Sequence, residues 1–96
     1  MSLDHESKIR RANDAKYILE HPLVVSALNA LRADVYSKIE DHGSDDKALR
    51  ALYHQLKAIG NFEAQFRFHV EEGKIAASML EKWKAEQRLK SARLRG

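Results

Sequence analysis

Hydrophobic residues recur along this chain with the spacing of an α-helix, in two consecutive segments separated by a polar turn. The first segment, at about residues 22–41, has apolar positions at Val24, Leu28, Leu31, Val35 and Ile39. The second, at about residues 45–72, has them at Leu49, Leu52, Leu56, Ile59, Phe66 and Val70. Spacings of three, four and seven residues place each set on one face of a helix. We therefore predict an all-α fold built on an antiparallel helical hairpin.

The turn between these segments carries signals that end one helix and begin the next. Gly43 suits the left-handed position that follows a helix C-terminus. Ser44 or Asp45 is the predicted N-cap of the second helix, and Asp46 is favourable in its first turn.

A further helix is predicted before the hairpin, at about residues 4–20. Its apolar stripe is weak, so this helix needs a partner to stay folded. The stripe consists of Ile9, Ala12, Ala15, Ile18 and Leu19. The His21-Pro22 pair predicts a break and a new helix starting at Pro22, because the residue before proline avoids helical angles and proline is favourable at a first helical position. A kinked continuous helix is the alternative.

Two glycines affect the second half of the chain. Gly60 interrupts the long apolar stripe at a cost of ~1 kcal/mol relative to alanine, and allows either the close approach of another helix or a bend. Gly73 is predicted to end this helix, with a fourth helix at about residues 74–93. The fourth helix carries Ile75, Met79, Leu80 and Trp83. We expect the last ten residues to fray or to be ordered by a partner.

The chain of 96 residues allows one domain with a thin core. A protein of this size buries only ~60–65% of its unfolded surface. The second hairpin helix would be ~42 Å long, against a radius of gyration of ~12–13 Å for a compact chain. We therefore expect self-association, with a compact four-helix monomer as the alternative. The predicted interface residues are Tyr53, Phe62, Phe66, Phe68 and Trp83. Those predicted to hold the fold are Leu28, Leu31, Val35, Leu52, Leu56 and Ile59.

Charge is distributed unevenly along the chain. Residues 23–72 carry six basic and eight acidic side chains, whereas residues 73–96 carry seven basic and two acidic ones. A basic helix of this kind can neutralise nucleic-acid phosphates without reading bases. The candidate phosphate contacts are Lys82, Lys84, Arg88, Lys90 and Arg93. The competing interpretation is a solvated helix end, with Trp83 anchoring the fourth helix to the hairpin and the cations favoured by the macrodipole. An acidic protein or a membrane surface is a further alternative.

The sequence contains no pattern that indicates catalysis or a cofactor. The absence of cysteine excludes disulfides, thiolate zinc sites and a cysteine nucleophile. None of the five histidines forms an i,i+4 pair, so we expect no metal site. The adjacent pairs Asp45/Asp46 and Glu71/Glu72 point apart on a helix and fit helix termini better than an acid–base dyad. No glycine-rich phosphate loop is present, and we predict that the protein is not an enzyme.

Nothing in the composition indicates a membrane or secreted protein. No apolar run approaches the ~18 residues that a membrane span requires. The first residues lack the apolar core and cleavage site of a signal peptide, so we expect no secretion.

Several short motifs occur in an order that resembles a group of small helical proteins of tailed bacteriophages. They are His21-Pro22-Leu23, Ala27-Leu28 with Leu31, residues 45–52, Leu56-Lys57 and Glu72-Gly73-Lys74-Ile75-Ala76. The resemblance covers about residues 17–80. It implies a phage protein located in the host bacterial cytoplasm or the virion, and it brings no catalytic residues.

Three hypotheses follow. The first is a non-enzymatic phage protein that acts by self-association or by docking on a larger virion or packaging assembly. The second is a DNA-associated accessory protein that binds phosphates through its basic C-terminal helix. The third is a small inhibitor of a host protein.

Overall fold

The computed structural model describes residues 2–95, which form three helices and no strand. Helix α1 spans Ser2–Glu20, α2 spans Pro22–Asp41, and α3 spans Asp46–Arg95. The all-α prediction is therefore confirmed.

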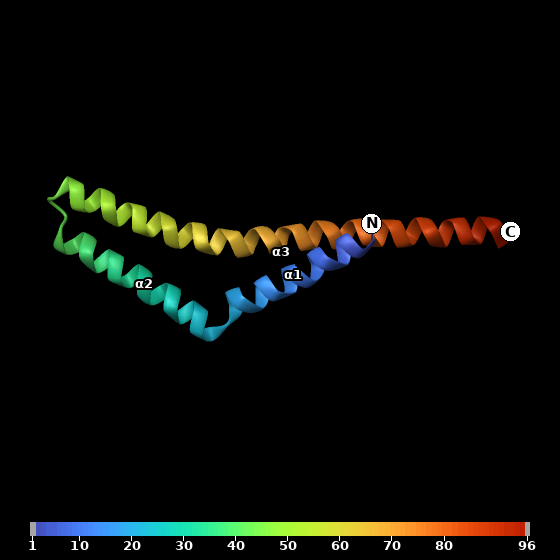
Figure 1. Ribbon diagram of the computed structural model, residues 1–96, viewed down its shortest axis with the longest axis horizontal. Helices are drawn as coiled ribbons and strands as arrows, with labels where there is room; N and C mark the ends of the chain where they lie inside the picture. The colour runs from blue at the N-terminus through green and yellow to red at the C-terminus, as the bar shows by residue number, and fades with distance from the viewer. Residues whose placement is uncertain (1, 96) are drawn as a thin grey trace.

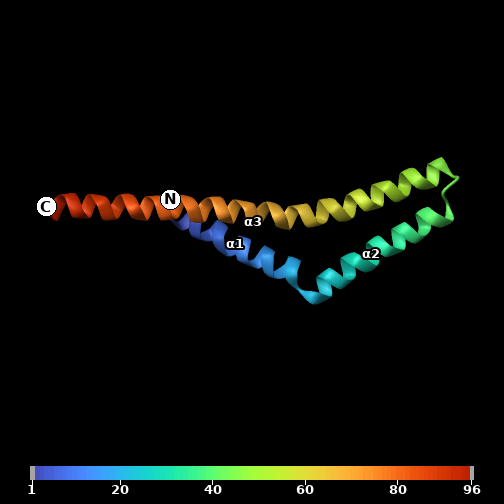
Figure 2. The same ribbon diagram turned by 180° about the vertical axis from the view of Figure 1, so that it is seen from behind.

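The molecule is a rod whose length is set by α3. This helix contains 50 residues, and the longest dimension of the molecule is 77 Å. Since a helix rises by about 1.5 Å per residue, α3 alone extends for about 75 Å. Helices α1 and α2 follow one another along α3, both antiparallel to it (Figure 1). The reverse view shows the same arrangement, with the joint between α1 and α2 bowed away from α3 (Figure 2). The radius of gyration of 21.6 Å rules out the compact four-helix alternative.

The predicted division of the chain at Gly73 is wrong, because α3 continues through it. The second hairpin helix and the predicted separate C-terminal helix are one element. Gly73 does not adopt positive φ, and α1 packs directly against it. Glu71 and Glu72 thus lie in the middle of a helix rather than at its end, and the Glu71 carboxylate accepts a hydrogen bond from Lys74 Nζ at 3.0 Å.

Gly73, rather than Gly60, is the glycine that permits the close approach of two helices. A Cβ added at Gly73 would lie 2.1 Å from Cβ of Ala12 and 3.3 Å from the carbonyl oxygen of Lys8. A Cβ added at Gly60 would meet nothing within 4 Å, so the predicted close approach there is wrong. The contact at Ala12 fixes how α1 lies on α3.

The break between the first two helices is confirmed, and the kinked continuous helix is wrong. His21 adopts an extended conformation (φ −65°, ψ 126°) between the end of α1 and the start of α2 at Pro22. Its Nδ1 accepts a hydrogen bond from the backbone N–H of Leu23 at 3.1 Å, so the histidine serves as N-cap of α2.

At the turn between α2 and α3, the predicted cap at the start of α3 is confirmed, and the predicted ending of α2 is not. Asp45 Oδ1 accepts hydrogen bonds from the N–H groups of Lys47 and Ala48, at 3.1 and 3.2 Å. Gly43 does not have positive φ, so the predicted left-handed ending of α2 is wrong. The N–H of His42 instead donates to the carbonyl of Lys38 at 3.0 Å, which continues the helical pattern.

The core is narrow and consists largely of small residues. The buried apolar side chains are Ala12, Ala15, Leu28, Val35, Leu52 and Ala76. Leu56 and Ile59 are half-buried. Leu31 is 52% exposed, so the prediction that it belongs to the core is wrong. Helices α1 and α2 pack mainly against successive parts of α3, and a single seam buries only a narrow line of each stripe. No helix in the described part of the chain is both long and apolar enough to cross a membrane.

Replacing Gly73 by alanine should destabilise the protein, although alanine favours helix formation. The added methyl group overlaps Ala12. Overpacking of this kind costs roughly 1–3 kcal/mol. The matched control, Gly60→Ala, meets no neighbour. It should raise stability by about 0.5–1 kcal/mol, which is the helical preference for alanine over glycine. Urea unfolding followed by circular dichroism measures both effects.

Combining Gly73→Ala with Ala12→Gly removes the overlap. This double variant should therefore recover part of the lost stability. Equal stabilisation by the Gly60 and Gly73 substitutions would show that the contact with Ala12 is not made in solution.

Candidate functional site

Large apolar side chains lie exposed along the whole molecule. Among the four exposed aromatic residues of the predicted interface, Phe68 is 56% exposed and Trp83 is 47% exposed. Tyr53 and Phe62 are exposed to a similar degree, whereas Phe66 is half-buried. Large contiguous patches of exposed apolar side chains mark interaction sites, whereas apolar residues scattered singly over a surface are normal.

Four of the exposed side chains lie along one side of α3. They are Tyr53, Phe68, Ile75 and Met79, which we call the apolar face of α3. At about 3.6 residues per turn, their spacing brings them within about 80° of one another around the helix axis. The polar residues Lys57, Asn61 and Glu71 lie between them on the same side. The buried residues Leu52, Glu63 and Gly73 point in other directions around α3. Helix α1 reaches one end of the apolar face, where His5 and Lys8 line a cavity of about 90 Å³ together with Ile75 and Met79.

The three phenylalanines of the predicted interface are divided between two environments. Phe62 and Phe66 make an edge-to-face contact on α3, with ring centroids 5.1 Å apart. Phe68 belongs to the apolar face, and its ring lies 5.6 Å from that of His69. The phenylalanines therefore do not form the single patch that their closeness in the sequence suggests.

The C-terminal part of α3 extends beyond the rest of the fold. Because Ala12 lies on Gly73 and the helices are antiparallel, the start of α1 faces about residue 83 of α3. Residues 84–95 thus form a solitary helix, which Figure 1 shows as the end labelled C. At the usual rise per residue this solitary helix is about 18 Å long. All side chains from 81 to 94 are exposed.

The five basic residues predicted to contact phosphates lie on and beside this solitary helix. They are Lys82, Lys84, Arg88, Lys90 and Arg93, and all are exposed. The structure brings them together on one element, which we call the basic extension. This stretch continues the packed part of α3, so it needs no separate nucleation of a helix.

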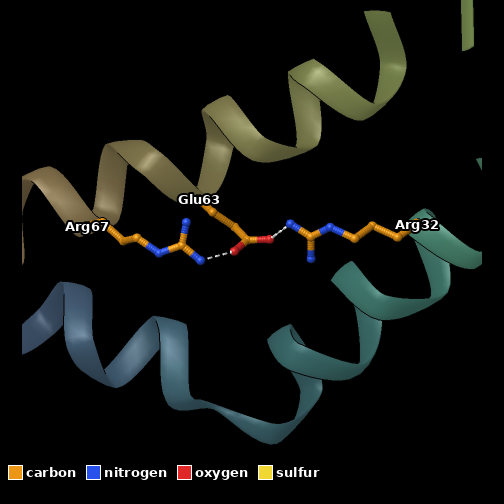
Figure 3. A network of polar contacts seen from close by, with 3 residues as sticks. All are labelled: Arg32, Glu63 and Arg67. Atoms are coloured by element: carbon orange, nitrogen blue, oxygen red, sulfur yellow. Dashed lines mark hydrogen bonds and ion pairs between the residues drawn. The ribbon is translucent and has the colours of Figure 1, made fainter. Parts of the chain in front are cut away.

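A polar cluster that sequence patterns alone do not predict joins α2 to α3. Glu63 is buried at 6% exposure, and its two carboxylate oxygens pair with two arginines (Figure 3). Oε1 accepts a hydrogen bond from Arg32 of α2, and Oε2 accepts one from Arg67, one turn along α3, at 2.6 Å. Arg32 is half-buried, although its sequence position predicts exposure.

These charged groups line an open cleft where the α1–α2 joint bows away from α3. The cleft has a volume of about 170 Å³ and is also lined by Leu19, Leu28 and Asn29. The long side chain of Arg32 bridges the separation between α2 and α3 at this point. The ion pair between Glu63 and Arg67 can be predicted from their i,i+4 spacing on a helix. The ion pair between Glu63 and Arg32 cannot, because it depends on how α2 packs against α3.

The described side chains contain no group of three or more histidines and carboxylates that could hold a metal ion. His69 is half-buried, and its Nδ1 lacks a hydrogen-bond partner. The acidic pair Asp45/Asp46 belongs to the turn and the first residues of α3, where Asp45 acts as a cap.

No known protein family, no curated protein and no solved structure was found to match this chain.

Glu63→Gln should destabilise the protein and loosen α2 from α3. Arg32 and Arg67 both keep contact with water. Removing one partner of a fully buried ion pair costs about 3–5 kcal/mol, so for this partly hydrated cluster we expect a loss of about 1–2 kcal/mol. The control is Glu71→Gln, whose pair with Lys74 is largely exposed. That pair should contribute less than about 1 kcal/mol. Chemical denaturation measures both, and equal losses would contradict a structural role for Glu63.

Proposed function

We propose that this protein is a non-enzymatic helical assembly protein, which acts by self-association or by docking on a larger assembly. One observation carries the proposal: the chain is an extended rod with a thin core and a row of large apolar side chains exposed on α3. A chain that buries so little of its apolar surface by itself gains stability when a partner covers that surface.

The chemistry of the exposed side chains supports this role. Aromatic residues contribute about 150–250 Å² each when they are fully buried, and they dominate the energetics of interfaces. On the apolar face of α3, Tyr53 and Phe68 supply aromatic rings, while Ile75 and Met79 supply aliphatic surface. Because these residues project from one continuous helix, a partner helix can contact all four of them.

The setting that we propose is that of a tailed bacteriophage, with the protein in the host bacterial cytoplasm or in the virion. This part of the proposal rests on the resemblance of the sequence motifs between residues 17 and 80. A rod of 77 Å with exposed faces is a suitable shape for a component of a virion or packaging assembly.

Phe68→Asp should lower the mass of the protein in solution while leaving its helices intact. The substitution places a charge in the proposed interface between molecules, which opposes association. Phe68 lies outside the seams that hold α1 and α2 to α3, so the helices should remain intact. Light scattering after size exclusion gives the mass, and circular dichroism gives the helix content. Gln55→Asp adds the same charge at an exposed position on the opposite side of α3 from the apolar face and should leave the mass unchanged.

A monomeric wild-type protein would remove self-association and leave docking on a different partner. Phe62→Asp is a second variant for the predicted interface, and it should also lower the mass if the edge-to-face pair with Phe66 contributes to the contact.

The basic extension supports a second candidate function, which is association with DNA through phosphates. The observation that favours it is the exposure of five cations near the end of α3, four of them within residues 84–95, against which neither α1 nor α2 packs. Such binding would not depend on base sequence and would weaken steeply as the salt concentration rises.

Replacing Lys84 and Arg88 together by glutamine should weaken binding to duplex DNA, measured by fluorescence anisotropy. The slope of log K against log salt should fall by about 0.9 for each phosphate contact that is lost. The control is Arg10→Gln with Arg11→Gln, which removes two exposed cations from α1. No binding of wild-type protein at low salt would eliminate this function.

A further inference from the structure

Two cavities adjoin where the α1–α2 joint bows away from α3. The first is the cleft of about 170 Å³ beside Glu63. The second has a volume of about 400 Å³ and lies between the last turn of α1 and α3. Leu19 and Arg67 line both cavities, so together they form one continuous cleft, which we call the joint cleft. Small-molecule sites have volumes of about 300–1,000 Å³, and the larger cavity alone reaches this range.

The joint cleft has an apolar interior. Leu28 is buried, and Leu19 and Val70 are half-buried. Lys16 and Lys74 also line the larger cavity, where the methylene groups of their side chains add apolar surface. An interior of this kind suits an aliphatic chain better than a fully polar ligand.

Positive charge exceeds negative charge around the joint cleft. At the larger cavity, Lys74 pairs with Glu71 at 3.0 Å, and α1 supplies one cation and one carboxylate, Lys16 and Glu20. At the smaller cavity, two arginines share the one buried carboxylate of Glu63. The lining of the whole cleft therefore contains four cations and three carboxylates, and one further anionic group would neutralise it.

Arg67 is the cation that is best placed to receive such a group. It lines both cavities, its side chain is 64% exposed, and one of its nitrogens donates to Glu63. A guanidinium group has five N–H donors in a fixed plane, so donors remain for a second carboxylate. Figure 3 shows Arg32 and Arg67 on opposite sides of the Glu63 carboxylate, which orients the Arg67 guanidinium.

We propose that the joint cleft binds a small amphiphilic carboxylate. Its anionic group pairs with Arg67, and its aliphatic chain lies against Leu19 and Val70. The pairing is favourable because arginine and carboxylate groups form strong, charge-assisted hydrogen bonds. The site does not involve the apolar face of α3 or the basic extension, so it is independent of self-association and of DNA binding.

Calorimetric titration of the full chain with octanoate tests the ligand class. Octanol has the same chain length without the charge, and acetate has the charge without the long chain. Octanoate should bind at one site per chain. Octanol and acetate should each bind at least about tenfold more weakly, because each lacks one of the two interactions.

Substitutions in the cleft test where octanoate binds. Arg67→Gln removes the proposed partner of the carboxylate and should weaken binding by about tenfold or more. Lys74→Glu makes the cleft negative without touching Glu63, and it should also weaken binding. The control is Arg50→Gln, which removes an exposed cation from the same helix at a position that lines neither cavity. Circular dichroism verifies that each variant keeps its helices.

Each result supports or overturns the proposal. Equal affinities for octanoate and octanol would overturn the role of the anionic group. Octanoate affinity that is unchanged in Arg67→Gln and Lys74→Glu, or lowered equally in Arg50→Gln, would overturn the location. The absence of saturable octanoate binding to the wild-type protein would overturn the site itself. The solution mass of the wild-type protein tests the proposed assembly function separately from all three results.

Discussion

The contact of Ala12 with Gly73 determines how the rest of the molecule is arranged. Since a Cβ at Gly73 would overlap Ala12, the glycine allows α1 to lie directly on the backbone of α3. Close packing favours small side chains on both helices, and Ala15 and Ala76 are buried in the same seam. Larger apolar groups do not fit between helices this close together. The same contact sets the register in which α1 begins near residue 83 of α3 and leaves the basic extension without a neighbour.

A second kind of interaction holds the molecule together where the close seam ends. The extended backbone at His21 and the ring of Pro22 interrupt the helix, and the joint bows away from α3. Glu63 fills part of this wider space with its carboxylate, paired with arginines from α2 and α3. Buried ion pairs add little net stability because the charges lose water, but they penalise arrangements that leave a charge unpaired. The cluster thus favours one position of α2 where the apolar contact is sparse.

Both features leave large apolar side chains outside the core. The narrow seams bury three alanines and three larger apolar side chains, and α3 presents Tyr53, Phe68 and Met79 to the solvent. The long axis also separates the turn between α2 and α3 from the basic extension. A partner that covered these side chains would add apolar burial that a single chain does not provide.

The sequence by itself determined the helical class, the break at His21-Pro22 and the cap at Asp45, because each depends on residues that are close together in the chain. Local patterns did not determine the continuity of α3. Glycine is typical of the position that follows a helix end, but Gly73 lies inside α3, where it packs against Ala12. The exposure of Leu31 and the pairing of Arg32 with Glu63 were also decided by tertiary structure. Periodicity shows which side chains share a face, but the number of neighbouring helices decides how much of that face is buried. In this chain α1 and α2 lie one after the other along α3, so each stretch of helix has one main neighbour, and apolar residues that periodicity assigns to a core remain at the surface.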